Sequence, residues 1–268
     1  MIGRELYGAF VAARAAALGA QNGRVVGRNA KRDVTRRFDQ LADAAIRRYA
    51  AAAIRAPVRI VSEESGERLT RPGRPARRWV VDPVDGSENF SRALGMSGMA
   101  IAELPAGGPM NADRVERALL GDLRTGVAYL TRRGAGATTQ TGRPVCVSWT
   151  RRLSEALVGC DLHFTRRRPE GRLLRLVGAC KDIRRMGSTV VELMCVADGR
   201  YDAYVDIRGE LTAEDFLAAS LVVREAGGWI TDRYGRDWGP IANLTQRFTV
   251  VAAGTKTLHR QLLKVLNG

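Results

Sequence analysis

The sequence contains few residues that commonly bind transition metals or act as general acids at neutral pH. Its two histidines are His163 and His259, and lysine occurs only at positions 31, 181, 256 and 264. Because histidine is so scarce, metal binding or acid–base catalysis would have to depend mainly on carboxylates.

The chain also lacks closely spaced cysteines, long apolar runs and an export signal. No C-x-x-C motif occurs, so a structural zinc site is not expected. Apolar stretches are broken by Arg or Gly well before the roughly 18 residues that a membrane-spanning helix requires. The N-terminus carries Glu5 and no continuous apolar segment, which argues against secretion. We therefore expect a cytoplasmic protein with free, buried thiols, and a disulfide only if the source is a hyperthermophile. The cysteines are Cys146, Cys160, Cys180 and Cys195.

Acidic residues are outnumbered by basic ones, 28 to 43, which leaves a net charge of +15. This excess favours anionic partners such as phosphorylated metabolites, nucleic acid or acidic membranes. The surplus is almost entirely arginine in an alanine-rich chain, which a GC-rich genome also produces without selection for function. Charge alone therefore does not decide the function. The 268 residues are 45% hydrophobic and 26% charged, as in a globular protein of one large or two small domains.

The first half of the chain has the pattern of an α+β unit. Helices are expected over residues 5–18 and from Asp33 or Phe38 to Arg55, with the polar, glycine-rich segment 19–32 as a loop between them. Short strands are expected over residues 58–61, 77–81, 99–104, 117–122 and 126–131.

After Trp149 strands and helices alternate, as in an α/β unit. Strands are expected over residues 157–162, 201–207 and 248–253. Helices are expected over residues 170–180, 188–197, 212–226 and 256–266. We therefore predict two halves, 1–148 and 149–268.

The most informative motif is Asp82-Pro83-Val84-Asp85-Gly86-Ser87, which follows an apolar strand. We expect Pro83 to end strand pairing and to fix a turn that brings Asp85 beside Asp82. Two adjacent carboxylates and the Val84 carbonyl suit Mg²⁺, which prefers oxygen ligands. Gly86 and Ser87 then offer backbone N–H groups to a phosphate at the start of a helix. Taken alone, the same motif also suits a surface turn with capping residues.

Two further acidic motifs stand at the ends of predicted elements. Glu63 and Glu64 follow the strand at 58–61, and if that strand is a parallel neighbour of 77–81, Glu63 and Asp82 leave the sheet at one edge. Alone, the Glu pair is more typical of a solvated turn. Thr212 and Asp215 match a helix capping box, which does not exclude a metal-binding role for Asp215.

Three stretches, in this order, resemble the inositol monophosphatase family, which also contains fructose-1,6-bisphosphatases and other magnesium-dependent, lithium-sensitive phosphatases. They are Ile60 to Gly66, Asp82 to Phe90 and Thr212 to Gly228. Asp33 to Asp39 and Asp206-Ile207-Arg208 look like the archaeal-type branch with dual specificity for inositol monophosphates and fructose 1,6-bisphosphate. The resemblance implies a layered α-β-α-β-α sandwich, usually a homodimer, that hydrolyses a small phosphorylated metabolite with two or three Mg²⁺ ions.

Carried onto this chain, the resemblance implies a role for each matching position. The implied metal ligands are Glu63, Asp82, Asp85, Asp215 and the carbonyl of Val84. The implied groups that orient the attacking water are Glu63, Ser87 and Asp39. The implied substrate contacts are Gly86, Ser87, Gly187, Ser188, Asp206 and Arg208. Arg208 would take a second phosphate, although it is equally readable as one surface charge among many.

The chain departs from the family pattern at several positions. Ser87 replaces the commoner Thr and keeps the hydroxyl, Glu214 stands where many members have Trp, and Asp206 is shorter than the usual Glu. The segment Val26 to Arg37 is unusually basic. These departures leave hydrolysis credible and leave the substrate open.

Two alternative functions therefore remain open in addition to that of a sugar or inositol phosphatase. The same site would also suit a nucleotide phosphatase acting on NADP or 3′-phosphoadenosine 5′-phosphate. A nucleic-acid-associated binding protein would use basic runs such as Arg77-Arg78 and Arg166-Arg167-Arg168. That alternative is disfavoured because the basic runs are not interleaved with aromatic residues.

Overall fold

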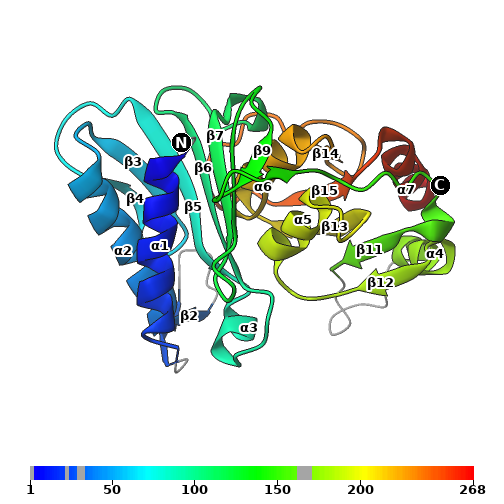
Figure 1. Ribbon diagram of the computed structural model, residues 1–268, viewed down its shortest axis with the longest axis horizontal. Coiled ribbons are helices and arrows are strands. Elements are labelled where there is room, and N and C mark those ends of the chain that lie inside the picture. Colours follow the sequence, from blue (N-terminus) through cyan, green and yellow to red (C-terminus); the bar gives the residue numbers. More distant parts are fainter. Residues whose placement is uncertain (1–2, 22–23, 29–33, 162–170) are drawn as a thin grey trace.

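The computed structural model describes residues 3–21, 24–28, 34–161 and 171–268. Five layers follow one another across the molecule: two helices, a large sheet, two helices, a second sheet and two outer helices (Figure 1). The predicted layered α-β-α-β-α sandwich is confirmed. Within the described part of the chain, no helix combines the length and the apolar character needed to span a membrane.

The first layer consists of α1 (Arg4–Leu18) and α2 (Arg37–Ala53), which pack against each other and against the large sheet. Phe38 and Ile46 of α2 recur at helical spacing and are fully buried. The sheet has the order β10-β9-β8-β7-β6-β5-β3-β4. Its strands are β3 (Val58–Ser62), β4 (Gly66–Leu69), β5 (Arg77–Asp85), β6 (Gly98–Pro105), β7 (Arg117–Asp122), β8 (Ala128–Arg132), β9 (Ala137–Thr139) and β10 (Pro144–Val145).

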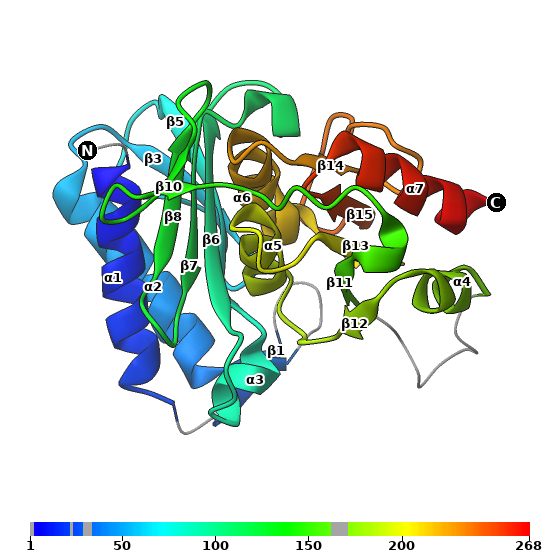
Figure 2. The same ribbon diagram turned by 45° about the vertical axis from the view of Figure 1, so that its right-hand side comes forward.

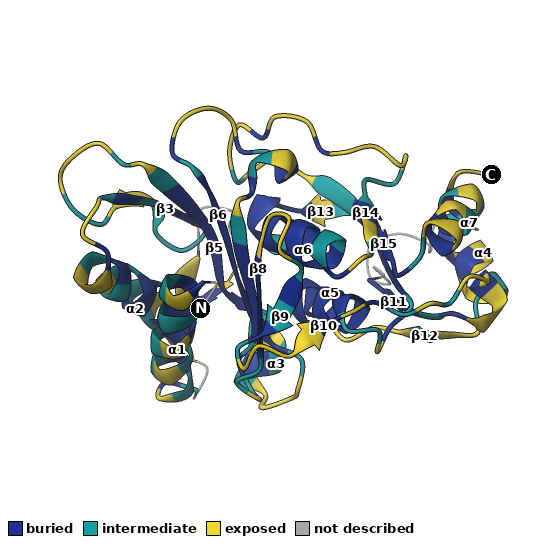
Figure 3. Ribbon diagram, turned by 45° about the horizontal axis from the view of Figure 1, so that its top comes forward, coloured by how far each residue is buried: buried dark blue, intermediate teal, exposed yellow. Residues whose placement is uncertain are grey.

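The central layer consists of α5 (Thr189–Ala197) and α6 (Ala213–Glu225), which lie between the two sheets (Figure 2). Every residue of α5 is buried, as expected for a helix in which most residues are apolar. Figure 3 shows α5 and most of α6 in the colour of buried residues. Val80 from the large sheet and Tyr204 from the second sheet belong to one hydrophobic cluster with these helices.

The second sheet has the order β12-β11-β13-β15-β14. Its strands are β11 (Leu157–Cys160), β12 (Asp182–Arg184), β13 (Ala203–Leu211), β14 (Trp229–Thr231) and β15 (Phe248–Ala253). The helices α4 (Gly171–Ala179) and α7 (Lys256–Asn267) cover its outer face, where alternate residues such as Ala203 and Val205 form a separate cluster with them. Because successive side chains of a strand point to opposite faces, the two faces of this sheet belong to two separate hydrophobic clusters.

The pairing of β3 with β5 positions the first acidic residues. The two strands are parallel, and Ser62 lies opposite Val81. Glu63 and Asp82 therefore follow at the same edge of the sheet, as predicted.

The prediction that Pro83 ends strand pairing is wrong. β5 continues to Asp85, where it pairs with Gly98 of β6, after Asp82 has paired with Ala100. Three steps along β5 face two along β6, so a β-bulge accommodates Pro83, which has no N–H for the ladder.

The prediction that the whole segment 19–32 is a loop is also wrong. Val25–Arg28 forms β1, which pairs with β2 (Val34–Arg36) in a small antiparallel sheet. Some expected features lie outside the described residues. They are the helix start at Asp33, the residue His163, the run Arg166-Arg167-Arg168, the end of the strand expected at 162 and the start of the helix expected at 170. The short strands β4, β9, β10, β12 and β14 were not predicted, since each takes its conformation from a neighbouring strand.

The remaining short elements are α3 (Ser87–Ser91) and 3-10 turns at Ala112–Arg114 and Leu153–Glu155. All four cysteines are free, as expected, but only Cys160 and Cys195 are buried, whereas Cys180 is half-buried and Cys146 is exposed. The large sheet ends at Val145 and the second begins at Leu157, while α5 and α6 pack against both sheets. The division into halves at 148 stays a prediction.

Candidate active site

The end of β5 and the start of α3 bring together the residues of the Asp82–Ser87 motif. Asp82 is 2% exposed, and its Oδ1 accepts a hydrogen bond of 3.1 Å from the N–H of Val84. Gly86 precedes α3 with φ of +76°, and a Cβ there would lie 3.1 Å from the carbonyl oxygens of Gly187 and Met96. Glycine is therefore required at this position by both backbone conformation and space.

Ser87 connects this turn to helix α2. Its Oγ lies 2.9 Å from Asp39 Oδ1 and 2.9 Å from the carbonyl oxygen of Val84. The single hydroxyl proton can be donated to either acceptor. The other oxygen of Asp39, Oδ2, accepts a 2.7 Å hydrogen bond from the N–H of Arg36, which fixes the carboxylate.

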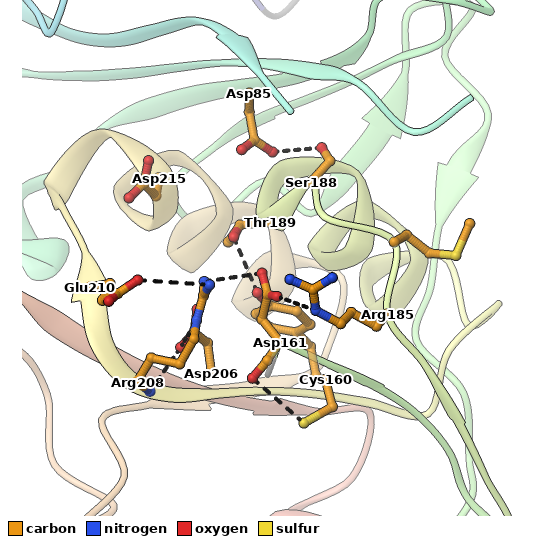
Figure 4. Close-up of polar contacts among 12 residues, drawn as sticks. Asp85, Cys160, Asp161, Arg185, Ser188, Thr189, Asp206, Arg208, Glu210 and Asp215 are labelled. Atoms are coloured by element: carbon orange, nitrogen blue, oxygen red, sulfur yellow. Dashed lines mark hydrogen bonds and ion pairs between the residues drawn. The ribbon is translucent and has the colours of Figure 1, made fainter. Parts of the chain in front are cut away.

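Asp85 connects the large sheet to the central helices (Figure 4). Its Oδ2 accepts hydrogen bonds of 2.6 Å from Ser188 Oγ and 2.7 Å from the N–H of Val190. Ser188 is the N-cap of α5, and its Oγ also accepts a 3.3 Å bond from the N–H of Val191. Gly187, with φ of +75°, lies beside Ser188 in the same turn.

Asp215 is presented by the first turn of α6. It completes the predicted capping box, because its Oδ2 accepts hydrogen bonds of 2.6 Å from the N–H and 3.2 Å from the hydroxyl of Thr212. Asp215 and Glu63 are both close enough to Asp85 for their charges to raise its pKa. The structure thus brings carboxylates from β5, α6 and the end of β3 to one place.

Burial and mutual repulsion raise the pKa values of these carboxyl groups. Burial, with a further contribution from Glu63, raises the pKa of Asp39 to about 7. Burial, followed by the charges of Glu63 and Asp39, raises the pKa of Glu64 to about 8. Burial and the charge of Asp215 raise the pKa of Asp85 as well. Nearby positive charge would relieve this repulsion.

The donor set fits a hard divalent cation, although the side chains are not closed around one. Among the residues that the structure describes, no three acidic, histidine or cysteine side chains converge closely enough to hold a metal ion as they stand. In both Asp85 and Asp215, Oδ2 accepts hydrogen bonds from the protein, whereas Oδ1 has no hydrogen bond within the described chain. Oriented carboxylates with one open oxygen, beside a backbone carbonyl at Val84, are typical of magnesium sites.

Asp206 and Arg208 lie apart from this cluster, on β13. Asp206 is fully buried, and Arg208 donates to both its oxygens, at 3.1 Å and 2.6 Å. The guanidinium also lies 3.0 Å from Asp161 Oδ2, and Arg185 binds the other oxygen of Asp161 at 3.1 Å (Figure 4). Arg208 is therefore a part-buried member of an ionic network rather than an isolated surface charge.

Sequence reasoning gave no role to three acidic groups that the structure places near the site. The charges of Glu63 and Asp39 contribute to the raised pKa of Glu64. Asp161 directly follows the end of β11. Glu192 is the only charged residue in the apolar helix α5 and is fully buried. Its isolation within an apolar run was the signal that could have identified it.

The sequence model of the inositol monophosphatase family matches residues 6–267. A protein of Methanothermobacter thermautotrophicus named fructose-1,6-bisphosphatase/inositol-1-monophosphatase is 33% identical over 218 residues, which are 78% of this chain and 75% of that protein. The Nus factor SuhB of Escherichia coli (strain K12) is 33% identical over 180 residues, which are 66% of this chain and 63% of that protein.

The fold is shared with solved structures. The crystal structure of the MJ0109 gene product, described as an inositol monophosphatase-fructose 1,6 bisphosphatase, superposes with a TM-score of 0.79 at 24% identity. The superposition covers 95% of this chain and 95% of that one.

Proposed function

Because the chain belongs to the inositol monophosphatase family and is therefore a metal-dependent phosphatase, we propose that it hydrolyses phosphate monoesters of sugars or inositols. The proposed substrates are inositol 1-phosphate and fructose 1,6-bisphosphate, the substrates named for the relative from Methanothermobacter thermautotrophicus. The observation that carries the proposal is that Asp215 and Glu63 lie close enough to Asp85 to raise its pKa, next to the turn in which Ser87 contacts Asp39. The proposed cofactor is Mg²⁺, with two or three ions in each site.

The proposed metal ligands are Glu63, Asp82, Asp85, Asp215 and the carbonyl of Val84. When bound, the cations would neutralise phosphate oxygens and increase the acidity of water at the site. The N–H groups of Gly86 and Ser87, which follow the end of β5, would bind phosphate oxygens.

Ser87 and Asp39 would move the proton of the attacking water. When Ser87 Oγ donates to Asp39, the hydroxyl can in turn accept a hydrogen bond from the attacking water and so orient it. Glu63 would assist from the end of β3. No covalent phospho-enzyme is expected, because the nearby carboxylates would be occupied as ligands.

Ser188 and Gly187 would contact the sugar or inositol through the turn that Asp85 holds in place. Arg208 would bind a second phosphate through the part of its guanidinium that the ionic network leaves accessible. Asp206 is fully buried and both its oxygens accept from Arg208, so it would position that guanidinium instead of contacting a hydroxyl group. We also propose that the protein forms a homodimer and is located in the cytoplasm.

The proposal is tested by measuring Mg²⁺-dependent phosphate release from inositol 1-phosphate, fructose 1,6-bisphosphate, NADP and 3′-phosphoadenosine 5′-phosphate. We expect release from the first two substrates and its inhibition by Li⁺. Asp85→Asn should remove most activity without unfolding the protein, whereas the exposed control Glu155→Gln should retain it. Release from the nucleotides alone would overturn the substrate assignment, and near-normal turnover by Asp85→Asn would overturn the site.

A further inference from the structure

Asn89, the third residue of α3, joins two segments that are far apart in the sequence. Its side-chain Nδ2 donates hydrogen bonds of 2.9 Å to the carbonyl oxygen of Met96 and 2.6 Å to the carbonyl oxygen of Met186. Because carbonyl oxygens only accept, the amide nitrogen of Asn89 must be the atom that faces them. One side-chain amide thus supplies a donor to each segment, and the second contact spans 97 residues.

Met96 has a backbone conformation that needs support. Its φ is +62°, in the left-handed region that residues with a side chain rarely adopt. Such a conformation persists only where the surrounding structure holds it. The hydrogen bond from Asn89 to the Met96 carbonyl is one such constraint, and the N–H of Leu94 donates to the carbonyl of Asn89 at 3.0 Å. Asn89 therefore holds the segment between α3 and β6 through both its side chain and its backbone.

The two segments that Asn89 joins enclose Gly86, where the phosphate is proposed to bind. A Cβ at Gly86 would lie 3.1 Å from the carbonyl oxygens of both Met96 and Gly187. Met96 therefore belongs to one wall of the Gly86 turn, and the segment of Met186 and Gly187 forms the other. The hydrogen bonds of Asn89 connect the two walls directly.

The wall around Gly187 is held at two points. After it in the chain, Ser188 Oγ donates to Asp85 Oδ2 at 2.6 Å. Before it, the carbonyl of Met186 accepts from Asn89. Without the contact to Asn89, the Asp85 contact would hold only the side next to α5, and the Gly187 carbonyl could move away from α3.

We propose that Asn89 is a positioning residue for substrate binding. Through its two hydrogen bonds it sets the distance between the N–H groups of Gly86 and Ser87 and the turn at Gly187. The former are proposed to bind phosphate and the latter to contact the sugar or inositol, so this inference rests on the proposed function. The substrate and the transition state use the same spacing, so its loss should raise KM more than it lowers kcat.

The kinetic test compares Asn89→Ala and Asn89→Asp with the control Asn267→Ala. The amide nitrogen of Asn267 also donates to two carbonyl oxygens, at 2.8 Å to Arg233 and 2.9 Å to Leu263, but it lies on the outer helix α7. We expect KM for inositol 1-phosphate to rise about 10-fold or more in both Asn89 variants, while kcat changes by less than about 3-fold. The control should keep both constants.

Hydrogen exchange tests the contact itself without using activity. In the full-length protein, the backbone amides of segments 86–98 and 186–190 should exchange faster in both Asn89 variants and at the unmodified rate in Asn267→Ala. Asn89→Asp keeps the size of the side chain but turns carboxylate oxygens toward the two carbonyls. It therefore tests the proposal even if Asn89→Ala does not fold.

Faster exchange together with a raised KM and a nearly unchanged kcat supports the proposal. Unchanged exchange in both segments would overturn the contact, and an unchanged KM would overturn the positioning role of Asn89. If the unmodified protein hydrolyses none of the phosphate esters, the proposed function fails. The exchange rates then decide by themselves whether Asn89 holds the two segments together.

Discussion

The hydroxyl oxygen of Ser87 lies 2.9 Å from the Oδ1 atom of Asp39, although 48 residues separate them in the sequence. The contact joins the first turn of α3 to the first turn of α2. It also places the hydroxyl within 2.9 Å of the Val84 carbonyl, one of the proposed metal ligands. The proposed role of Ser87 depends on this geometry.

Replacing Ser87 with Ala should reduce kcat by about 10²- to 10⁴-fold with little change in KM, because it removes a group that handles a proton in the reaction. Ser87→Thr keeps the hydroxyl and should retain activity within a few fold. Steady-state kinetics on inositol 1-phosphate would measure both variants. A kcat for Ser87→Ala close to that of the unmodified enzyme would exclude this role.

Divalent cations should stabilise the protein and bind more tightly as the pH rises. The pKa of Asp39 is about 7 and that of Asp85 is raised, so protons compete with the cation near neutral pH. At a Mg²⁺ concentration about 100 times Kd, the gain in unfolding free energy should be about 2.7 kcal/mol. Thermal unfolding with and without Mg²⁺ at pH 6 and pH 8 would measure this. A stabilisation that is unchanged in Asp85→Asn would show that the cation binds elsewhere.

Arg208→Lys should separate a substrate role of Arg208 from its structural role. Lysine keeps the positive charge beside Asp206 but loses the planar fork. If Arg208 binds a second phosphate, KM for fructose 1,6-bisphosphate should rise roughly 10-fold while KM for inositol 1-phosphate changes little. An equal loss on both substrates would indicate that Arg208 only holds the network with Asp206 and Asp161.

Glu192→Gln should flatten the dependence of stability on pH. Both carboxyl oxygens of Glu192 are buried. Burial, followed by the charge of Asp161, raises its pKa to about 8, against the backbone N–H groups of Met186 and Gly187, which lower it. The folded protein therefore holds this proton more tightly than the unfolded chain. The associated stability is fully present below the unfolded pKa of about 4.5 and is lost as the pH rises to about 8, by at most about 1.4 kcal/mol per unit.

Urea unfolding at pH 5.5 and pH 7.5 would measure the effect. Glu192→Gln should lose less stability between these two values than the unmodified protein, because glutamine does not titrate. The exposed Glu155→Gln is the control and should show the unmodified slope. An unchanged slope in Glu192→Gln would mean that the carboxyl group is ionised in the folded protein.

Several features of the site were determined by the sequence alone. The apolar strand before Asp82, the apolar run of α5 and the Thr212–Asp215 capping box each depend on residues within a few positions of one another. Such local patterns reflect backbone preference and burial, which a sequence displays directly. The placement of Glu63 beside Asp82 was predictable on the further condition that their strands are parallel, which they are.

Only the tertiary structure decided the rest. The bulge that keeps Asp85 in the ladder past Pro83, the hydrogen bond from Ser188 to Asp85 across 103 residues, and the pairing of Arg208 with Asp161 all join distant segments. Local propensities do not specify these pairings, because their free energy arises from burial, register and charge compensation when the layers come together.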